Sequence, residues 1–227
     1  SSGGPLGIVT TDLVGTSGYN TGSVAGELSD TNYTNDFGGT SSATPLAAGC
    51  VALVLQANPN LGWRDVQEIL IRSATKNHVA DTDWADNAAG IHFNHKYGAG
   101  LINTQAAVTM ASTWTNLVAQ TSTSSAQTGL SVAIPDNNAT GITRSFDLSA
   151  SNLRVEQVAL TLSATHTSRG HLAVTLTSPS GMVSRLAERH ADTGDHYSAW
   201  TFSSVRCWGE NSQGIWTLRV SDLTSGT

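Results

Sequence analysis

The stretch from Gly38 to Leu55 constrains the fold of this chain more than any other part of its sequence. Two glycines and a cluster of Thr and Ser precede an apolar run, 46–55, which is followed by Asn58-Pro59, where a helix has to stop. A helix that is apolar on every side is buried in the middle of a sizeable domain. Because Pro45 is tolerated only in the first turn of a helix, this helix is expected to begin close to Ser41.

Ser41 would then lie at the N-terminus of a central helix, where free N–H groups and the helix dipole favour negative charge. An acyl-transfer nucleophile is useful there, because its own backbone N–H can face the developing oxyanion. The alternative interpretation is a Ser/Thr-rich N-cap on a core helix, since caps are common and nucleophiles are rare. The helix pattern alone leaves both interpretations open.

The residues around the serine resemble a known motif. The subtilisin-like proteases carry Gly-Thr-Ser-x-Ala-x-Pro, and this chain matches every fixed position with Gly39, Thr40, Ser41, Ala43 and Pro45. The Gly-x-Ser-x-Gly motif of the α/β-hydrolases does not fit, because alanine replaces its second glycine. Residues 8–13, 57–67 and 95–101 are similar to the kexin/furin branch, the proprotein convertases, and a bacterial type is expected.

The second half of the chain has a period of two from about residue 130. Short strands separated by turns are predicted at 131–135, 155–162, 171–177, 200–205 and 215–220, which is typical of a β-sandwich. Residues 169–181 and 214–220 resemble the convertase P domain. The resemblance implies an α/β subtilisin-like catalytic domain, of which only the C-terminal portion is present, followed by an all-β jelly-roll β-sandwich, the P domain.

We expect three segments: a catalytic portion over 1–115, a linker over 116–129, and a P domain over 130–227 that lacks its last strand. Within the first segment the pattern predicts a strand at 8–11, a long loop at 14–40, and helices at 63–73 and 102–112. The family's Asp and His motifs precede its serine, yet no histidine occurs before His78. The chain is therefore expected to be an internal piece of a longer protease, separated by nicking, by experimental design or by an incomplete gene.

The resemblance implies a serine endopeptidase that cleaves after basic residues through an acyl-enzyme on Ser41, whose backbone N–H contributes to the oxyanion hole. The catalytic Asp and His would lie upstream, so the chain alone is expected to be inactive. Its expected partners are a peptide or protein substrate and the missing N-terminal part of the catalytic domain. The alternative hypothesis is a non-catalytic fragment or vestigial protease half with a partner-binding β-sandwich.

Calcium is the cofactor that the resemblance implies, with most ligands outside this chain. Asp81, Asp83, Asp86 and Asn87 stand close together, and alternating acidic oxygens are able to hold Ca²⁺. Because the EF-hand glycine and terminal glutamate are missing, a solvated loop is favoured. No metal ligand is assigned.

The amino-acid composition limits the possible partners and the cellular location of the protein. The net charge is −6 and only two lysines occur, so a nucleic-acid partner has no basic footprint. The low lysine content and polar surface suit a secreted, extracellular or periplasmic protein. No apolar segment is expected to span a membrane. Cys50 and Cys207 are interpreted as free packing thiols and His95 as structural, and a surface or hydrogen-bonded position is expected for His166, His171, His190 and His196.

Overall fold

The computed structural model describes residues 7–226, which form two compact units. The first unit runs to Ser73 and includes Ile102–Asn116, and the second contains Ala74–Leu101 and the residues from Leu117 onward. Segment 74–101 therefore folds with the C-terminal half of the chain. The predicted boundaries at 115 and 130 stay predictions, because compactness within this chain does not test where the catalytic domain of an assembled protease ends.

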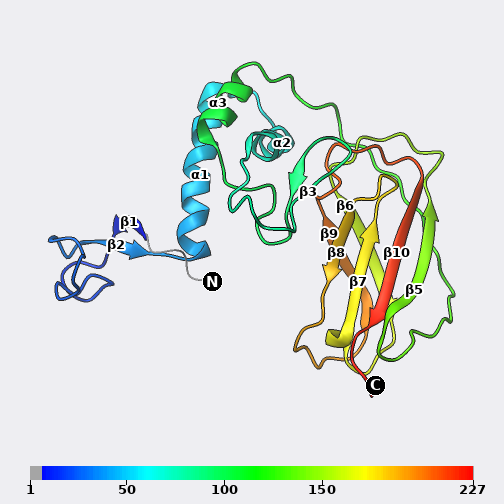
Figure 1. The fold of residues 1–227 in the computed structure, drawn as a ribbon. Helices are drawn as coiled ribbons and strands as arrows, with labels where there is room; N and C mark the ends of the chain where they lie inside the picture. The colour runs from blue at the N-terminus through cyan, green and yellow to red at the C-terminus, as the bar shows by residue number, and fades with distance from the viewer. Residues whose placement is uncertain (1–6, 227) are drawn as a thin grey trace. The chain divides into compact units, whose positions relative to one another are not determined.

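The first unit contains a β-hairpin and three helices (Figure 1). Its elements are β1 (Ile8–Thr11), β2 (Tyr33–Phe37), α1 (Thr40–Ala57), α2 (Trp63–Ser73) and α3 (Thr104–Ser112). The predicted strand at 8–11 and helix at 63–73 are confirmed at the same bounds, and the helix predicted at 102–112 begins two residues later. Strand β2 lies within the segment predicted to be a loop and pairs antiparallel with β1.

A buried asparagine organises the loop between β1 and β2. The Asn20 side chain is fully buried, and its Nδ2 donates to the carbonyl oxygens of Leu28 (2.8 Å) and Tyr33 (2.9 Å). Its Oδ1 accepts the N–H of Gly22 at 2.9 Å. The loop thus satisfies its own backbone groups through one amide, as buried polar groups require.

Helices α2 and α3 begin at side-chain caps. The Asp65 carboxylate accepts the N–H of Gly62 at 2.8 Å, which is one half of a capping box, although glycine itself offers no side-chain cap. Asn103 accepts the N–H of Ala106 at 3.0 Å. The helices meet in a small core whose fully buried members are Val54, Ile69, Ala107 and Ala111.

Helix α1 leaves most of its apolar surface exposed within this unit. Leu46, Leu53 and Leu55 are 60%, 49% and 37% exposed, and only Ser42 and Val54 are buried. Burial on all sides is expected of this helix only in a complete catalytic domain, and within the described residues it is uncovered, as expected of a chain that holds only part of that domain. The physical reason is that a hairpin and two short helices supply too little surface to cover it.

The length of α1 also corrects a prediction. It has 18 residues with a mean hydropathy of 1.3, so it is long and apolar enough to cross a membrane by length and composition. The expectation that no apolar segment reaches that length is wrong. The criterion is weak evidence for a membrane span, because core helices of soluble proteins meet it too.

The second unit is an antiparallel β-sandwich with a short hairpin of segment 74–101. The hairpin pairs β3 (Ala85–Asp86) with β4 (His92–Phe93). One sheet has the strand order β5-β10-β7-β8 and the other pairs β6 with β9 (Figure 1). The sandwich strands are β5 (Asn138–Asp147), β6 (Val158–Ala164), β7 (Leu172–Thr177), β8 (Val183–Ala187), β9 (Tyr197–Ser204) and β10 (Ile215–Asp222).

Four of the five strands predicted for this half are confirmed with shifts of a few residues, as β6, β7, β9 and β10. The strand predicted at 131–135 is wrong, because these residues form no strand. Strands β5 and β8 were not predicted. The turn at 178–181 is present, and Gly181 has a φ of 95°, a value that favours glycine.

The sandwich core depends on the alternation of β7 and β10. Leu176 lies opposite Leu218, and Val174 lies opposite Val220, and all four are buried. Cross-strand apolar pairs of this kind stabilise a sheet. The other buried members of this core are Val155, Leu172, Met182, Tyr197, Cys207 and Trp216.

Segment 74–101 is fixed to the sandwich through Asn87. The buried Asn87 Nδ2 donates to the carbonyl oxygens of Arg206 (3.0 Å) and Trp208 (2.9 Å). Its Oδ1 accepts the N–H groups of Ala89 and Ile91 at 3.0 Å each. A buried amide with all these bonds made holds the two segments in one geometry.

We expect the 227-residue chain to self-associate through the exposed face of α1. Burying one leucine side chain contributes about 1.5–3 kcal/mol, and exposed apolar patches drive association. Replacing Leu46 and Leu53 by glutamine should shift the chain toward monomer in sedimentation velocity, whereas Leu13→Gln in the β1–β2 loop should not. A monodisperse monomer at high concentration with a cooperative melt would contradict this expectation.

We expect limited proteolysis to cut between about residues 112 and 130. Residues 114–129 form neither helix nor strand and are mostly exposed, which makes them accessible to a protease. Chymotrypsin should cut after Trp114, Leu117 or Leu130, and mass spectrometry under denaturing conditions should identify the two fragments. Cleavage confined to 14–40, with 112–130 protected, is the opposite outcome.

Candidate active site

Ser41 is the second residue of α1, and its side chain is exposed. The N-cap residue is Gly39, with a φ of 81° and a ψ of −171°, a conformation that favours glycine. No side chain caps the helix. The capping interpretation therefore does not describe Ser41, because the cap position belongs to a glycine.

The start of α1 leaves the backbone N–H of Ser41 without a helical acceptor. The N–H of Ala43 donates to the Gly39 carbonyl at 3.3 Å, and the N–H groups before it precede the helical ladder. These groups and the helix dipole make the N-terminus favourable for negative charge. The N–H of Ser41 is thus available to an oxyanion.

The two adjacent serines occupy different environments. Ser42 is buried, and its Oγ donates to the Gly39 carbonyl at 2.9 Å. Ser41 is exposed, since a step of one residue turns the side chain by about 100° around the helix. The hydroxyl that faces solvent is therefore that of Ser41.

Pro45 was predicted to lie in the first turn of the helix, and this position is wrong. The helix does begin next to Ser41, but Pro45 is its sixth residue and lies in the second turn. Proline has no N–H to donate to the Ser41 carbonyl four residues earlier. Because Ser41 and Pro45 are both exposed, water is able to satisfy that carbonyl.

The unit that carries Ser41 contains no histidine. All seven histidines of the chain lie at position 78 or later, and none falls within 102–116. They therefore belong to the second unit. A serine that lacks a neighbouring base is a weak nucleophile near neutral pH, because its hydroxyl keeps its proton.

His95 forms a dense polar network with Asp83 and Arg185. The backbone N–H and the Nδ1 of His95 contact the Asp83 carboxylate at 2.6 Å and 3.0 Å, and its Nε2 accepts the N–H of Arg185 at 3.1 Å. Arg185 Nη2 also binds Asp83 at 2.8 Å. These bonds assign the proton to Nδ1, so the imidazole is neutral and its second nitrogen is engaged.

The surroundings shift the pKa of both members of this pair. Burial, aided by the positive charge of Arg206, lowers the pKa of His95 against the opposing effect of its hydrogen bond to Asp83. Burial raises the pKa of Asp83, but the hydrogen bonds from the His95 backbone and side chain and the positive charge of Arg185 outweigh it and leave that pKa lowered. This geometry supports the structural role inferred for His95.

The histidines of the sandwich occupy varied environments. His166 is largely buried, and its Nε2 lies 3.1 Å from Asp222. His190 and His196 are exposed. His171 is half-buried, and its Nδ1 has no hydrogen-bond partner within residues 7–226, contrary to the expectation of a surface or hydrogen-bonded position.

The acidic residues of the 81–87 loop do not fit a calcium site. The Asp81 carboxylate binds Lys96 Nζ at 2.6 Å, and this hydrogen bond helps lower its pKa to about 2. Asp83 is held by His95 and Arg185, and Asp86 lies 3.1 Å from Lys76 Nζ. Each carboxylate already has a cationic partner, so the oxygens are not arranged around a common centre. Within the described residues, no group of three or more His, Cys, Asp or Glu side chains suits a metal ion.

Both cysteines are free thiols. Burial raises the pKa of Cys207 to about 12, so this thiol stays protonated. Cys50 is half-buried on α1, and its Sγ accepts a hydrogen bond from Thr104 Oγ1 at 2.9 Å. Neither is placed as a nucleophile.

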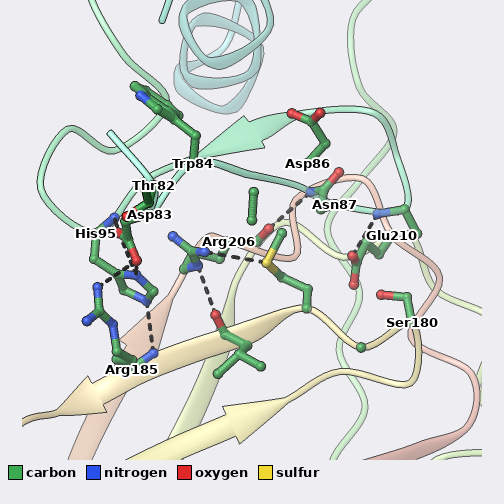
Figure 2. A pocket seen from close by; sticks show the side chains of 15 residues that line it. Thr82, Asp83, Trp84, Asp86, Asn87, His95, Ser180, Arg185, Arg206 and Glu210 are labelled. Atoms are coloured by element: carbon green, nitrogen blue, oxygen red, sulfur yellow. Dashed lines mark hydrogen bonds and ion pairs between the residues drawn. The ribbon is translucent and has the colours of Figure 1, made fainter. Parts of the chain in front are cut away.

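Sequence reasoning missed Arg206 and Glu210, two buried charged residues that line a cavity of about 480 Å³ in the second unit (Figure 2). Asp83, His95 and Arg185 line the same cavity. No local signal could have found it, because its walls come from residues 82–95 and from residues 180–210, two stretches that are far apart in the sequence.

Two family models match the chain. Residues 6–100 match the subtilase family, and residues 155–227 match the proprotein convertase P-domain. The two matches leave 101–154 outside both models. They are consistent with the strand pattern of the second unit, whose sheets form the sandwich.

Relatives and solved structures agree with these matches. The chain is 40% identical over 201 residues to human proprotein convertase subtilisin/kexin type 7, covering 85% of this chain and 26% of that protein. It is 39% identical over 208 residues to kexin of Saccharomyces cerevisiae, with 85% and 25% covered. A crystal structure of the serine protease of Aeromonas sobria superposes with a TM-score of 0.84 at 28% identity, covering 96% of this chain and 44% of that one. The chain thus spans about a quarter of the length of the curated relatives.

We expect acid to destabilise the second unit through His95. Its pKa is lowered in the folded state, so its contribution to stability is present above the unfolded value of 6.5 and is lost as pH falls below it. The His95→Asn variant should lose part of the decline in urea midpoint between pH 7 and pH 5, measured by near-ultraviolet circular dichroism of the buried tryptophans. The matched variant His78→Gln, at an exposed site, should keep the decline. An unchanged decline in His95→Asn would show that other groups cause it.

Proposed function

This chain combines the serine-bearing part of a subtilase with a P domain of the proprotein convertase type, and we propose that it belongs to a serine endopeptidase in which Ser41 is the nucleophile. The observation that carries the proposal is the exposed position of Ser41 as the second residue of α1, two residues after the glycine cap. The motif residues Gly39, Thr40, Ala43 and Pro45 surround it.

In the proposed reaction, Ser41 Oγ attacks the carbonyl carbon of a peptide bond while its proton passes to a histidine base. The carbonyl oxygen becomes an oxyanion, which the Ser41 N–H stabilises at the helix N-terminus. The amine then leaves with the proton from the histidine, and an acyl-enzyme remains on Oγ. Water attacks this ester by the same steps and regenerates the serine.

We propose that the histidine and the aspartate that orients it come from the catalytic domain upstream of residue 1. Motif order supports this, since the family places both before its serine, and the first unit has no histidine of its own. The uncovered leucines of α1 provide the surface against which that upstream part would pack. The partner of this chain in catalysis is therefore the remainder of the same domain.

The finer properties rest on the family resemblance alone. Cleavage after basic residues and a calcium requirement are proposed for the assembled protease, with ligands other than the carboxylates at 81–86. Secretion, or export to a periplasm, is proposed from the low lysine content. A peptide or protein is the proposed substrate.

A second candidate is a non-catalytic fragment whose sandwich binds a partner. The observation that favours it is the separation of Ser41 from every histidine of the chain into a different compact unit. An intact histidine and aspartate in the reading frame before residue 1 would favour the enzyme.

We expect a fluorophosphonate probe to label Ser41 only when the upstream segment is present with calcium. Removing one triad member leaves catalysis on the order of 10³–10⁴-fold over water, and that remainder depends on the oxyanion hole and on substrate binding. Here base, orienting carboxylate and substrate pocket are expected elsewhere, so the 227-residue chain should show neither labelling nor turnover. Mass spectrometry of the labelled peptide locates the modified residue.

Two matched variants of the longer protein make this test specific. Ser41→Ala should abolish labelling, whereas Ser42→Ala, which removes a buried hydroxyl bonded to Gly39, should retain it. Labelling of the 227-residue chain at a comparable rate would mean that a base within it activates Ser41. That result would refute the assignment of the base to the upstream domain.

A further inference from the structure

The second unit contains a cavity of about 480 Å³, within the range of small-molecule sites. It lies between the 82–95 segment and three parts of the sandwich: the turn at 180–183, strand β8, and the 206–210 loop. Figure 2 shows Asp83, His95 and Arg185 toward one end and Glu210 and Ser180 toward the other, with Arg206 between them.

Most polar groups around the cavity already have partners. Asp83, His95 and Arg185 bind one another, and Arg185 Nη1 also binds Glu188 at 2.6 Å. Asn87 uses both ends of its amide on backbone groups. These residues form the wall and need nothing from a ligand.

The Arg206 guanidinium has N–H donors that are not used in hydrogen bonds within the described residues. It is 9% exposed, and its Nε donates to the Val183 carbonyl at 3.0 Å. Its Nη2 lies 3.6 Å from the Met182 sulfur, a weak acceptor. Its Nη1 has no hydrogen-bond partner within residues 7–226. A buried guanidinium in this state is costly unless an acceptor joins it.

The Glu210 carboxylate, in contrast, has an unused hydrogen-bond acceptor. It is 2% exposed, and its Oε1 accepts the N–H of Ala88 at 2.9 Å. Its Oε2 has no hydrogen-bond partner in the described part of the chain. Figure 2 shows Glu210 apart from Arg206, and no ion pair joins the two. The cavity thus presents one unmatched donor group and one unmatched acceptor group at separate places.

We propose that this cavity binds a small zwitterion, with a carboxylate on Arg206, an ammonium group on Glu210 and an alkyl spacer between them. An anion alone would leave Glu210 unmatched and would face the negative charge of Asp86, and a cation alone would leave Arg206 unmatched. Met182 and Val183 are among the residues that line the cavity and supply apolar surface for the spacer. The ligand class is that of amino acids with separated charges.

The test compares zwitterions with their halves on the 227-residue chain. The probes are 4-aminobutanoate, 6-aminohexanoate and 8-aminooctanoate, with butanoate, hexanoate, octanoate and the matching alkylamines as halves. Ligand-observed saturation-transfer NMR measures the dissociation constants and tolerates an associating protein. The best zwitterion should bind at least tenfold more tightly than either of its halves, because only it satisfies both charges.

Charge-removing variants assign the two contacts. Arg206→Gln should reduce the zwitterion to the affinity of the amine while the amine keeps its own, and Glu210→Gln should reduce it to that of the carboxylate. Retained binding of the untouched half shows that each variant folds. The matched control Arg189→Gln, at an exposed site outside the cavity, should change nothing.

Two results would overturn the proposal. If no zwitterion binds more tightly than its halves, the cavity does not recognise paired charges. If hexanoate alone equals 6-aminohexanoate, the site takes an anion only. The comparison on the unmodified chain decides both, even where a variant fails to fold.

Discussion

The apolar surface of α1 is the constraint on which the serine-bearing unit depends. A helix that is apolar on nearly every side has to be packed against other elements on every side. Of the 18 residues of α1, only Ser42 and Val54 are buried in this unit. The helix start fixes the direction of the Ser41 N–H and hydroxyl, so whatever covers α1 would also hold the proposed nucleophile in place. Folding and the proposed catalysis therefore both need a second layer packed against the leucines of α1.

The second unit is held together by a different kind of interaction. Segment 74–101 belongs to the stretch that matches the subtilase model, yet it folds with the sandwich through Asn87, through Glu210 on the Ala88 N–H, and through the Asp83–His95–Arg185 network. These bonds are directional, so they fix one arrangement more strictly than apolar packing does. The same polar contacts leave a cavity whose charges are only partly matched, and the proposed ligand recognition lies there rather than in the apolar core.

The sequence predicted helices and strands correctly where their apolar residues recur at a regular spacing. Helix α2 has charged and apolar positions at helical spacing, β7 alternates strictly, and β10 alternates from Trp216 to Val220, so their predicted bounds were close to correct. Strand β5 was missed because it has only two apolar residues that pack against the core, Ile142 and Phe146. The glycine, arginine and polar residues around them leave no clear alternating pattern. Residues 131–135 alternate equally well but find no partner strand, and pairing depends on residues far away in the sequence.

For the candidate site, too, the sequence indicated some features and the structure added others. The motif around Gly39, Thr40 and Ser41 predicted Ser41 as the nucleophile, and that role stays a prediction. The helix pattern alone did not indicate which of the two adjacent serines faces solvent. The structure separates them: Ser42 spends its hydroxyl on the Gly39 carbonyl, inside the unit, while Ser41 has neither a capping task nor burial. A hydroxyl without a structural task at a helix N-terminus is free for chemistry. What it lacks is a base, and a base is a long-range property that no stretch of consecutive residues encodes.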